Sequence, residues 1–371
     1  MKENSERGSR AKKTPPLVVG TGLVALDVVV SRISGKPPRY WSGGTCGNVL
    51  TVLSYLGWKA QPVARLGTGI ATDLVVEDLK RWNVSDRFIR VDDDGRTPVI
   101  VERITKNIRG VPRHSFSWRC TECGAPFPGY RAELGEVAEE IATQLGQPQV
   151  FFFDRVSSGA LILARACAEA GGLIVFEPSG VGNPILFRRA WQLAHVVKYS
   201  HERLSELPEM DTCRSPRLQI ETLGDEGLRY RRTGAGNRPT RWIELKSLPV
   251  PSVKDTAGAG DWCTAGLLSR VGREGLQGFL KITDQQLREA LRYGQALSAW
   301  NCAFEGARGG MYVVSRRVFA DQISKIESGV NDVKAVSIEH LESTDDDLKT
   351  LCNVCDVAIA TKARRTTATS T

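Results

Sequence analysis

The sequence predicts an α/β fold built on a mainly parallel sheet. Short apolar runs near residues 17–19, 150–153, 173–176 and 194–197 have the length of buried strands. Segments of helical length, such as 159–170, separate them. Strands that alternate with helices in this way indicate βαβ units, whose strands run parallel. Ligands on such sheets bind beyond the carboxyl ends of the strands, and polar residues follow the apolar runs there: Asp154, Glu177 and Ser200.

The composition is that of a soluble globular protein. The 371 residues suffice for one large α/β domain with an appendage, or for two small domains. The sequence shows no apolar run of membrane-spanning length and no signal-peptide core at its N-terminus. Its nine cysteines, an odd number dispersed along the chain, argue against a secreted disulfide framework. We therefore expect a cytoplasmic protein without a membrane partner.

The formal net charge is +8, to which a basic N-terminus and the basic segment 362–365 contribute. A nucleic-acid surface would need basic residues clustered on one folded face. A polyanionic substrate such as ATP accounts for part of this charge. We therefore expect no nucleic-acid partner.

Residues 254–262, Lys-Asp-Thr-Ala-Gly-Ala-Gly-Asp-Trp, form the most informative stretch. Small residues let the backbone approach a ligand closely. If residues 258–261 form the first turn of a helix, their unpaired N–H groups make an anion site. Asp261 would then lie beside the anion, placed to accept a proton from an attacking nucleophile. A phosphate cradle beside a carboxylate base implies phosphoryl transfer. The alternative is a glycine-rich turn whose Asp merely favours the helix start.

The run Asp-Thr-Ala-Gly-Ala-Gly-Asp at 255–261 resembles the C-terminal signature of the PfkB/ribokinase-like carbohydrate kinases. The resemblance implies a ribokinase-like fold, with helices on both faces of the sheet and a small β lid, and it implies ATP and Mg²⁺ as cofactors. In that family the last Asp is the catalytic base, and the Gly-Ala-Gly amides form the anion hole for the transferred phosphate. The corresponding residues here are Asp261 and Gly258, Ala259 and Gly260.

Two N-terminal elements extend the resemblance. Asp27 lies within an apolar run, where a charge needs a partner, either an internal salt bridge or a substrate hydroxyl. The family carries an Asp here that holds sugar hydroxyls. Gly43, Gly44 and Asn48 precede a helix expected near 49–56 and match the family's Gly-Gly-x-x-x-Asn element. The resemblance thus implies that these four residues bind a small sugar-like substrate.

Lid strands are expected near 30–42 and 96–120, with a Cys-x-x-Cys insertion near 114–130. A second Cys-x-x-Cys lies far away, close to the C-terminus. If the two pairs meet, their four thiolates complete a tetrahedral structural Zn²⁺ site. Two separate reduced pairs, or a redox-sensitive pair, are the alternatives. The candidate ligands are Cys120, Cys123, Cys352 and Cys355.

The nucleotide side departs from the family pattern. Where the family has Asn-x-x-Glu after a strand, this chain has Ser200 to Arg203, and Glu202 is displaced by one position. Glu177 and Glu202 are therefore candidate Mg²⁺ ligands. A turn at 219–227 resembles the family's Thr-x-Gly-x-x-Gly turn against the nucleotide, and position 295 aligns with an Asn that often lines the adenine pocket. The expected nucleotide-binding residues are Lys198, Ser200, Thr222, Gly224, Gly227 and Gln295.

The expected organisation is a disordered basic leader at 1–15, a kinase domain at 16–328 and a polar C-terminal extension at 329–371. The expected activity is ATP-dependent phosphorylation of a hydroxyl on a sugar or sugar-like substrate. A non-catalytic binding or regulatory protein is one alternative, and the lid is a candidate surface for a homodimer. A nucleoside kinase of the same fold is another alternative; it would need an aromatic wall for its base, with candidates Trp41, Phe116 and Trp118.

Overall fold

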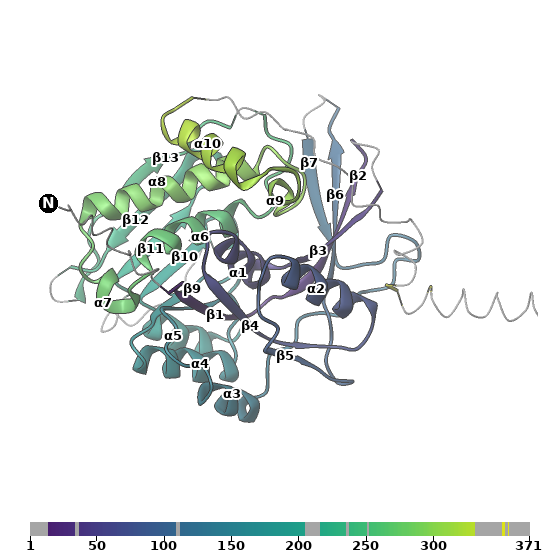
Figure 1. The fold of residues 1–371 in the computed structure, drawn as a ribbon, viewed down its shortest axis with the longest axis horizontal. Helices are drawn as coiled ribbons and strands as arrows, with labels where there is room; N and C mark the ends of the chain where they lie inside the picture. The colour runs from purple at the N-terminus through teal and green to yellow at the C-terminus, as the bar shows by residue number, and fades with distance from the viewer. Residues whose placement is uncertain are drawn as a thin grey trace, which may run out of the picture.

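The computed structural model describes residues 14–33, 37–108, 112–204, 216–234, 237–250, 252–330, 351–352 and 355. A large sheet lies between two layers of helices, and a smaller sheet stands at one side of it (Figure 1). The predicted α/β arrangement is confirmed. Nearly all of the predicted leader at 1–15, and most of the extension at 329–371, lie outside the described residues.

The large sheet has nine strands in the order β13-β12-β11-β10-β9-β8-β1-β4-β5. Neighbours from β11 to β5 are parallel, while β12 and β13 add an antiparallel edge. The carboxyl ends of the parallel strands therefore meet at one edge of the sheet, where ligands of such folds bind. The strands are β1 (Leu17–Thr21), β4 (Lys59–Leu66), β5 (Phe88–Val91), β8 (Val150–Phe153), β9 (Leu173–Phe176), β10 (Val196–Ser200), β11 (Leu218–Thr222), β12 (Gly227–Arg232) and β13 (Ile243–Lys246).

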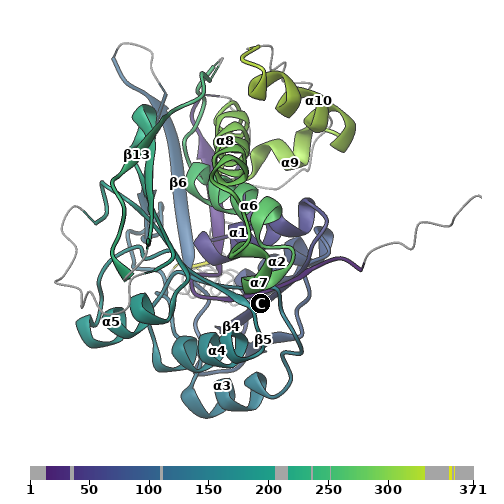
Figure 2. The ribbon, with the colours of Figure 1, turned by 90° about the vertical axis from the view of Figure 1, so that its left-hand side faces the viewer.

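Alternating side chains of the strands face two separate cores. In β8, Phe151 and Phe153 belong to one core, whereas Val150 and Phe152 belong to the other, as the two-residue period of a strand requires. The first core is covered by α3 (Gly135–Ala142), α4 (Ser158–Glu169) and α5 (Pro184–Leu193). The second is covered mainly by α1 (Thr45–Tyr55), α6 (Ala259–Val271), α8 (Asp284–Asn301) and α10 (Arg316–Glu327), which lie on the opposite side of the sheet (Figure 2).

The small sheet has the order β3-β2-β6-β7 and fits the predicted lid. Its hairpins β2–β3 and β6–β7 are antiparallel, and β2 runs parallel to β6. Helix α2 (Ile70–Arg81) packs against β2 and β3. The strands are β2 (Ala25–Ser31), β3 (Arg39–Gly43), β6 (Val99–Lys106) and β7 (Pro112–Ser117).

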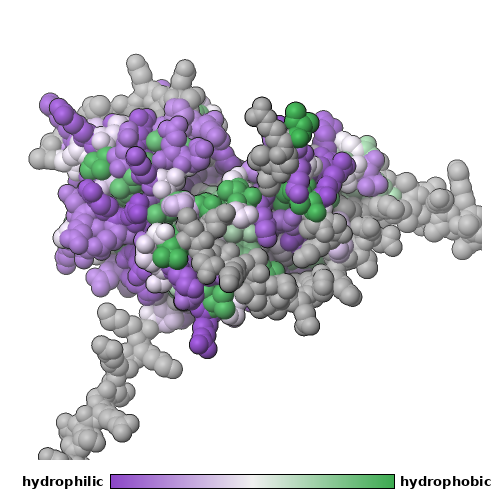
Figure 3. All heavy atoms as spheres, turned by 90° about the horizontal axis from the view of Figure 1, so that it is seen from above, coloured by the Kyte–Doolittle hydropathy of each residue, from purple (hydrophilic) through white to green (hydrophobic). Residues whose placement is uncertain are grey.

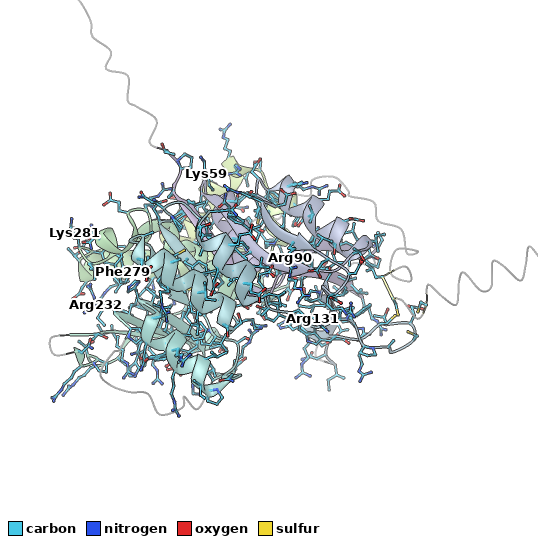
Figure 4. The ribbon with its side chains drawn as sticks, turned by 90° about the horizontal axis from the view of Figure 1, so that it is seen from below. Lys59, Arg90, Arg131, Arg232, Phe279 and Lys281 are labelled. Carbon is cyan, nitrogen blue, oxygen red and sulfur yellow. The ribbon has the colours of Figure 1, made fainter. Side chains whose placement is uncertain are left out.

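The antiparallel edge of the large sheet is fastened to the turn before α8. Arg232 of β12 donates to the Asp284 carboxylate at 2.6 Å and to the Ile282 carbonyl at 3.3 Å. Figure 4 shows Arg232 close to Phe279, the last residue of α7 (Gly275–Phe279), and to Lys281, which follows that helix. The edge strand is thereby held to the helical layer that carries α8.

Helices α6 and α8 pack at unusually close range through two glycines. A Cβ atom added to Gly294 would lie 2.5 Å from the Cys263 carbonyl oxygen, and one added to Gly266 would lie 2.7 Å from Gly294 Cα. Nothing larger than hydrogen fits between the two backbones at this crossing. The position of α6, which begins within the 254–262 motif, therefore depends on this contact.

We predict that Gly294→Val lowers the free energy of unfolding by about 1–3 kcal/mol, because the added side chain overpacks the α6–α8 crossing. Chemical denaturation monitored by circular dichroism measures this change. Gly135→Ala is the matched control, since its Cβ would approach other atoms no closer than 3.9 Å. Equal stability of the two variants would contradict the close packing.

Candidate active site

The 254–262 motif forms a sharp turn into α6, as the sequence predicts. Gly258 precedes the helix with φ of 71°, and a Cβ there would lie 2.3 Å from the Ala307 carbonyl oxygen. The Ala259 N–H already donates to the Thr256 carbonyl at 3.2 Å, and Trp262 is bonded back to Gly258. An anion at this helix start would therefore rely chiefly on the amides of Gly258 and Gly260 rather than on Ala259.

Asp261 lies in the first turn of α6 and accepts a hydrogen bond from Asn48 Nδ2 at 2.8 Å. Desolvation, and next the negative charge of Glu177, raise the pKa of Asp261 to about 8. The Asn48 hydrogen bond and the Lys198 ammonium act in the opposite direction. A carboxyl group whose pKa lies near neutrality can exchange a proton under physiological conditions.

Arg308 fixes the orientation of Asn48. Its Nε donates to Asn48 Oδ1 at 3.0 Å, so the Asn48 amide must point its NH₂ group at Asp261. The same guanidinium donates to Asp78 at 3.0 Å and to the Ser42 hydroxyl at 2.8 Å. Arg308 is 1% exposed and Asp78 is 6% exposed. Such a buried pair holds its geometry because breaking it leaves an uncompensated charge.

Asp27 of β2 lies on the inner face of the lid sheet. A Cβ at Gly43 would lie 2.0 Å from the Asp27 carboxyl group, so the glycine leaves the room that this carboxyl occupies. Burial raises the pKa of Asp27 to about 7, whereas Arg308 and the Gly44 backbone lower it. The structure thus brings Asp27, Gly43, Gly44 and Asn48 together, as the sequence predicts.

Two further acidic residues, Glu102 of the lid and Asp255 of the 254–262 motif, lie close together. Glu102 of β6 is 1% exposed, and desolvation followed by the Asp255 charge raises its pKa well above the usual value. Asp255 also lies 3.3 Å from His114 Nδ1 of β7. Residues paired across neighbouring strands share a face, and Glu102 is paired with Phe116. Glu102, His114 and Phe116 therefore project from the same side of the lid, toward the 254–262 motif.

The lid and the motif enclose a hollow. A cleft of about 190 Å³ lies between β7 and the segment 253–256, with His114, Asp255 and Thr256 in its lining. Seen from above, the surface has a notch between the main body and the lobe at the right, the side on which the lid stands (Figure 3). The acidic residues of the lid and the start of α6 thus face each other.

Most of the expected nucleotide-binding residues lie in β10, at the carboxyl ends of β10 and β11, or just after them. Lys198 donates to Glu177 at 2.5 Å and to the Gly260 carbonyl at 3.1 Å, so this ion pair sits against the start of α6. Thr264 donates to the other Glu177 oxygen at 2.5 Å. Ser200 and Thr222 are paired at the ends of their strands, and Gly224 begins the short helix η1 (Gly224–Glu226), which Gly227 follows.

Gln295 and Glu202 lie further from this centre. The Gln295 amide in α8 donates to the Leu245 and Lys246 carbonyls at 3.3 and 3.2 Å, which ties α8 to β13. Glu202 lies in the exposed turn after β10. Arg203, which occupies the family's Glu position, lowers the pKa of Asp261 through its charge. Of the two candidate Mg²⁺ ligands, Glu177 is the one beside the α6 turn.

The two Cys-x-x-Cys pairs meet. The sulfur atoms of Cys120, Cys123, Cys352 and Cys355 all lie within 4.8 Å of one another. The sequence was compatible with one shared cluster or with two separate pairs. The structure contains the shared cluster.

Sequence reasoning missed Arg308, Asp78, Glu102 and Asp255 as parts of the site. Glu102 carried a recognisable signal, because it interrupts the alternating apolar strand 99–104 on the face shared with Ile100 and Ile104. Arg308 lies among glycines and had no neighbour in sequence that pointed to Asn48. The buried ion pair of Arg308 and Asp78 joins positions 230 residues apart, so it produces no local pattern in the sequence.

The comparisons with known proteins agree with this geometry. The model of the pfkB family of carbohydrate kinases matches residues 24–312, and the chain belongs to this family. It is 25% identical over 325 residues to the probable fructokinase-6, chloroplastic, of Arabidopsis thaliana, with 79% of each chain covered.

Two solved structures share the fold. The aminoimidazole riboside kinase of Salmonella enterica has a TM-score of 0.61 at 21% identity, covering 84% of this chain and 99% of that one. The fructokinase of Xylella fastidiosa has a TM-score of 0.59 at 18% identity, covering 78% and 93%. The ribokinase-like fold is thus confirmed. Among the described residues, no helix is both long and apolar enough to cross a bilayer.

We predict that Asp261→Asn is more stable than the unsubstituted protein at pH 8 and equally stable near pH 4. The folded-state pKa of Asp261 is raised from 3.8 to about 8, so the folded chain binds more protons than the unfolded chain between these values. Folding stability due to this group therefore falls as pH rises through that window. Denaturation at both pH values should show a gain on the order of several kcal/mol at pH 8, because each pKa unit is worth about 1.4 kcal/mol, and little change near pH 4. A gain independent of pH would contradict the raised pKa.

Proposed function

We propose that this protein transfers the γ-phosphoryl group of ATP to a hydroxyl of an uncharged sugar or sugar-like acceptor. One observation carries the proposal: the Asp261 carboxyl group lies in the first turn of α6 and accepts a hydrogen bond from Asn48, whose backbone N–H donates to the Gly44 carbonyl beside the lid. In this proposal the catalytic base, the phosphate-binding amides and the pocket for the sugar-like substrate lie next to one another. Membership of a carbohydrate kinase family supports the same reaction.

In this proposal Asp261 is the catalytic base. It accepts the proton of the acceptor hydroxyl while the hydroxyl oxygen forms the new bond to the γ-phosphorus and the bond to the β-phosphate oxygen breaks. The amides of Gly258 and Gly260, with Ala259 between them, bind the charge of the moving phosphoryl group. Asp261 acts only when ionised, and the Asn48 hydrogen bond and Lys198 favour that form.

Asp27, Gly43, Gly44 and Asn48 are the proposed acceptor-binding residues. Asp27 accepts hydrogen bonds from hydroxyls, Gly43 leaves room for its carboxyl group, and the Gly44 backbone donates to that carboxyl group. The charge of Asp27 helps to raise the pKa of Glu102, so a phosphate placed here would add negative charge beside carboxyl groups that already resist ionisation. An uncharged polyol satisfies these oxygens without adding negative charge.

ATP is proposed to lie along the carboxyl ends of β10 and β11, near Lys198, Ser200, Thr222, Gly224 and Gly227. Gln295 belongs to the same proposal, through its contact with β13. Lys198 and Arg203 supply positive charge toward the α6 turn.

Mg²⁺ binds proteins through one or two carboxylates together with substrate phosphates. Glu177 fits this role because its oxygens lie at the α6 turn, and Glu202 is the further candidate. When bound, the ion neutralises charge on the phosphates. Glu177 and Glu202 would hold the ion in place of the Asn-x-x-Glu element that this chain lacks. The four-cysteine cluster lies outside this reaction centre, and its candidate Zn²⁺ is a separate proposal. The cytoplasmic location and the homodimer through the lid stay predictions.

A nucleoside acceptor is the second candidate, because Phe116 offers an aromatic face. Phe116 is 50% exposed and shares its face of the lid with Glu102. Trp41 is not available for this role, since it is 6% exposed and stacks on Tyr312 at 4.2 Å between ring centroids. The aminoimidazole riboside kinase that shares this fold was solved with aminoimidazole riboside and an ATP analog, which supports this candidate.

We predict that Asp261→Asn lowers kcat by about 10²–10⁴-fold, the usual contribution of a general base, while ATP binding persists. In the unsubstituted enzyme kcat/KM should rise from pH 6 to about 8 and level off above, because the base must lose its proton. ADP release measures both. Asp321→Asn, an exposed carboxylate on α10, is the control. Retained turnover in Asp261→Asn would contradict the assignment of Asp261 as the catalytic base. Absence of turnover in the unsubstituted protein with every acceptor tested would favour a binding protein.

We predict that uncharged sugars or polyols give ADP release and that their phosphate esters give at least about tenfold less, since each added anion meets the Asp27 and Glu102 carboxyl groups. Phe116→Ala distinguishes the two acceptor classes. A nucleoside substrate should show a raised KM in this variant through lost stacking, whereas a sugar should not. Preference for a sugar phosphate would contradict the neutral pocket.

A further inference from the structure

We propose that the four-cysteine cluster binds one structural Zn²⁺ ion, which fastens the C-terminal segment to the base of the lid. Cys120 and Cys123 come from the turn after β7, and Cys352 and Cys355 from the C-terminal region. In Figure 1 the described residues of that region (yellow) lie on the right, on the side of the lid, and away from α10. The cluster therefore joins segments that are 229 residues apart.

The distances between the sulfur atoms fit a single metal ion. Sγ of Cys120 lies 3.9 Å from that of Cys355, and Sγ of Cys123 lies 3.5 Å from that of Cys352. Zinc–sulfur bonds of about 2.3 Å in a tetrahedron separate the sulfurs by about 3.8 Å. A disulfide would need about 2.05 Å. A cluster of several irons needs space between its thiolates, which four sulfurs within 4.8 Å of one another do not leave.

The backbone around the first pair is already shaped for metal binding. The Cys120 N–H donates to the Ala125 carbonyl at 2.8 Å, and the Gly124 N–H donates back to Cys120 at 3.1 Å. These bonds close the tight turn between the two cysteines. Phe127 then donates to the Trp118 carbonyl at 2.8 Å, so the turn continues the β6–β7 hairpin of the lid.

The ligand set is closed and half-buried. Cys120 and Cys352 are 3% and 4% exposed, and they belong to the core that also contains Phe127 and Leu351. Four protein thiolates leave no coordination position open for a substrate, which is the arrangement of a structural zinc site. Binding converts four thiols into thiolates and releases their protons to solvent. The Arg119 guanidinium, bonded to the Gly124 carbonyl at 3.0 Å, places a positive charge beside the resulting anionic centre.

The consequence for catalysis rests on the proposed function. The turn that carries Cys120 continues directly from β7, the strand of His114 and Phe116, over the 254–262 motif. A metal that holds this turn restricts the motion of the lid strand. Loss of the metal should therefore raise KM for the acceptor more than KM for ATP.

The test is metal analysis of the full-length protein, with Cys120→Ser, Cys355→Ser and the control Cys167→Ala, a buried cysteine of α4 outside the cluster. We expect about one zinc per chain in the unsubstituted protein and the control, and loss of most of it in both serine variants. Hydrogen exchange over residues 112–127 should accelerate in the serine variants alone, a readout that holds whether or not the protein is a kinase.

Replacement of the metal by Co²⁺ keeps the proposal testable if a serine variant fails to fold, because tetrahedral cobalt thiolate has a distinctive visible spectrum. That spectrum in the unsubstituted protein supports the site. Protein without metal whose four thiols react freely would overturn it, as would disulfides between these cysteines in mass spectrometry, or iron with sulfide in place of zinc.

Discussion

The buried guanidinium of Arg308 is the interaction on which the site depends. It bonds to Asn48 on α1, to Ser42 on β3 and to Asp78 on α2, and so joins the lid to the main body. Tyr312 donates to the same Asp78. Because each partner is buried, any displacement leaves an unpaired charge in a medium that cannot solvate it. The geometry around Asp261 is therefore fixed by an ion pair on the far side of Asn48.

The site holds its carboxyl groups at a price in stability, because burial raises the pKa of Asp27, Asp154 and Asp261 to about 7, 6 and 8. Each carboxyl group whose pKa is raised in this way lowers the free energy of unfolding at neutral pH. Asp154 shows that this burial also has structural uses, since it accepts the Leu23 N–H at 2.9 Å and the Arg155 guanidinium at 2.6 Å. The neighbouring cations Arg308, Arg155 and Lys198 reduce this destabilisation, because each lowers the pKa of the carboxyl group beside it. An acceptor hydroxyl would relieve it further by donating to the carboxylates.

Local patterns in the sequence sufficed for the fold and for the turn at Gly258. Apolar runs such as 173–176 match their strand residue for residue, because a fully buried strand is recognisable by composition alone. Helix starts were less accurate: the helix expected near 49–56 begins at Thr45, since Gly44 at φ of 75° ends the preceding strand and lets the helix start at once. Long-range partners such as Arg308 and Asp78 could not be predicted, because nothing near them in the chain specifies which elements the fold brings together.

In the cysteine cluster the sequence supplies the four candidate ligands, and the fold brings them to one place. Either pair alone is an incomplete ligand set, and its spacing is compatible with several chemistries. The three-dimensional structure decides among them, because it places Cys352 against Cys123. A link between positions 229 residues apart removes conformational freedom mainly from the unfolded chain. In the proposed zinc site the same link would anchor the turn that follows the strand of His114 and Phe116, so the position of this lid strand would depend on one set of sulfur atoms.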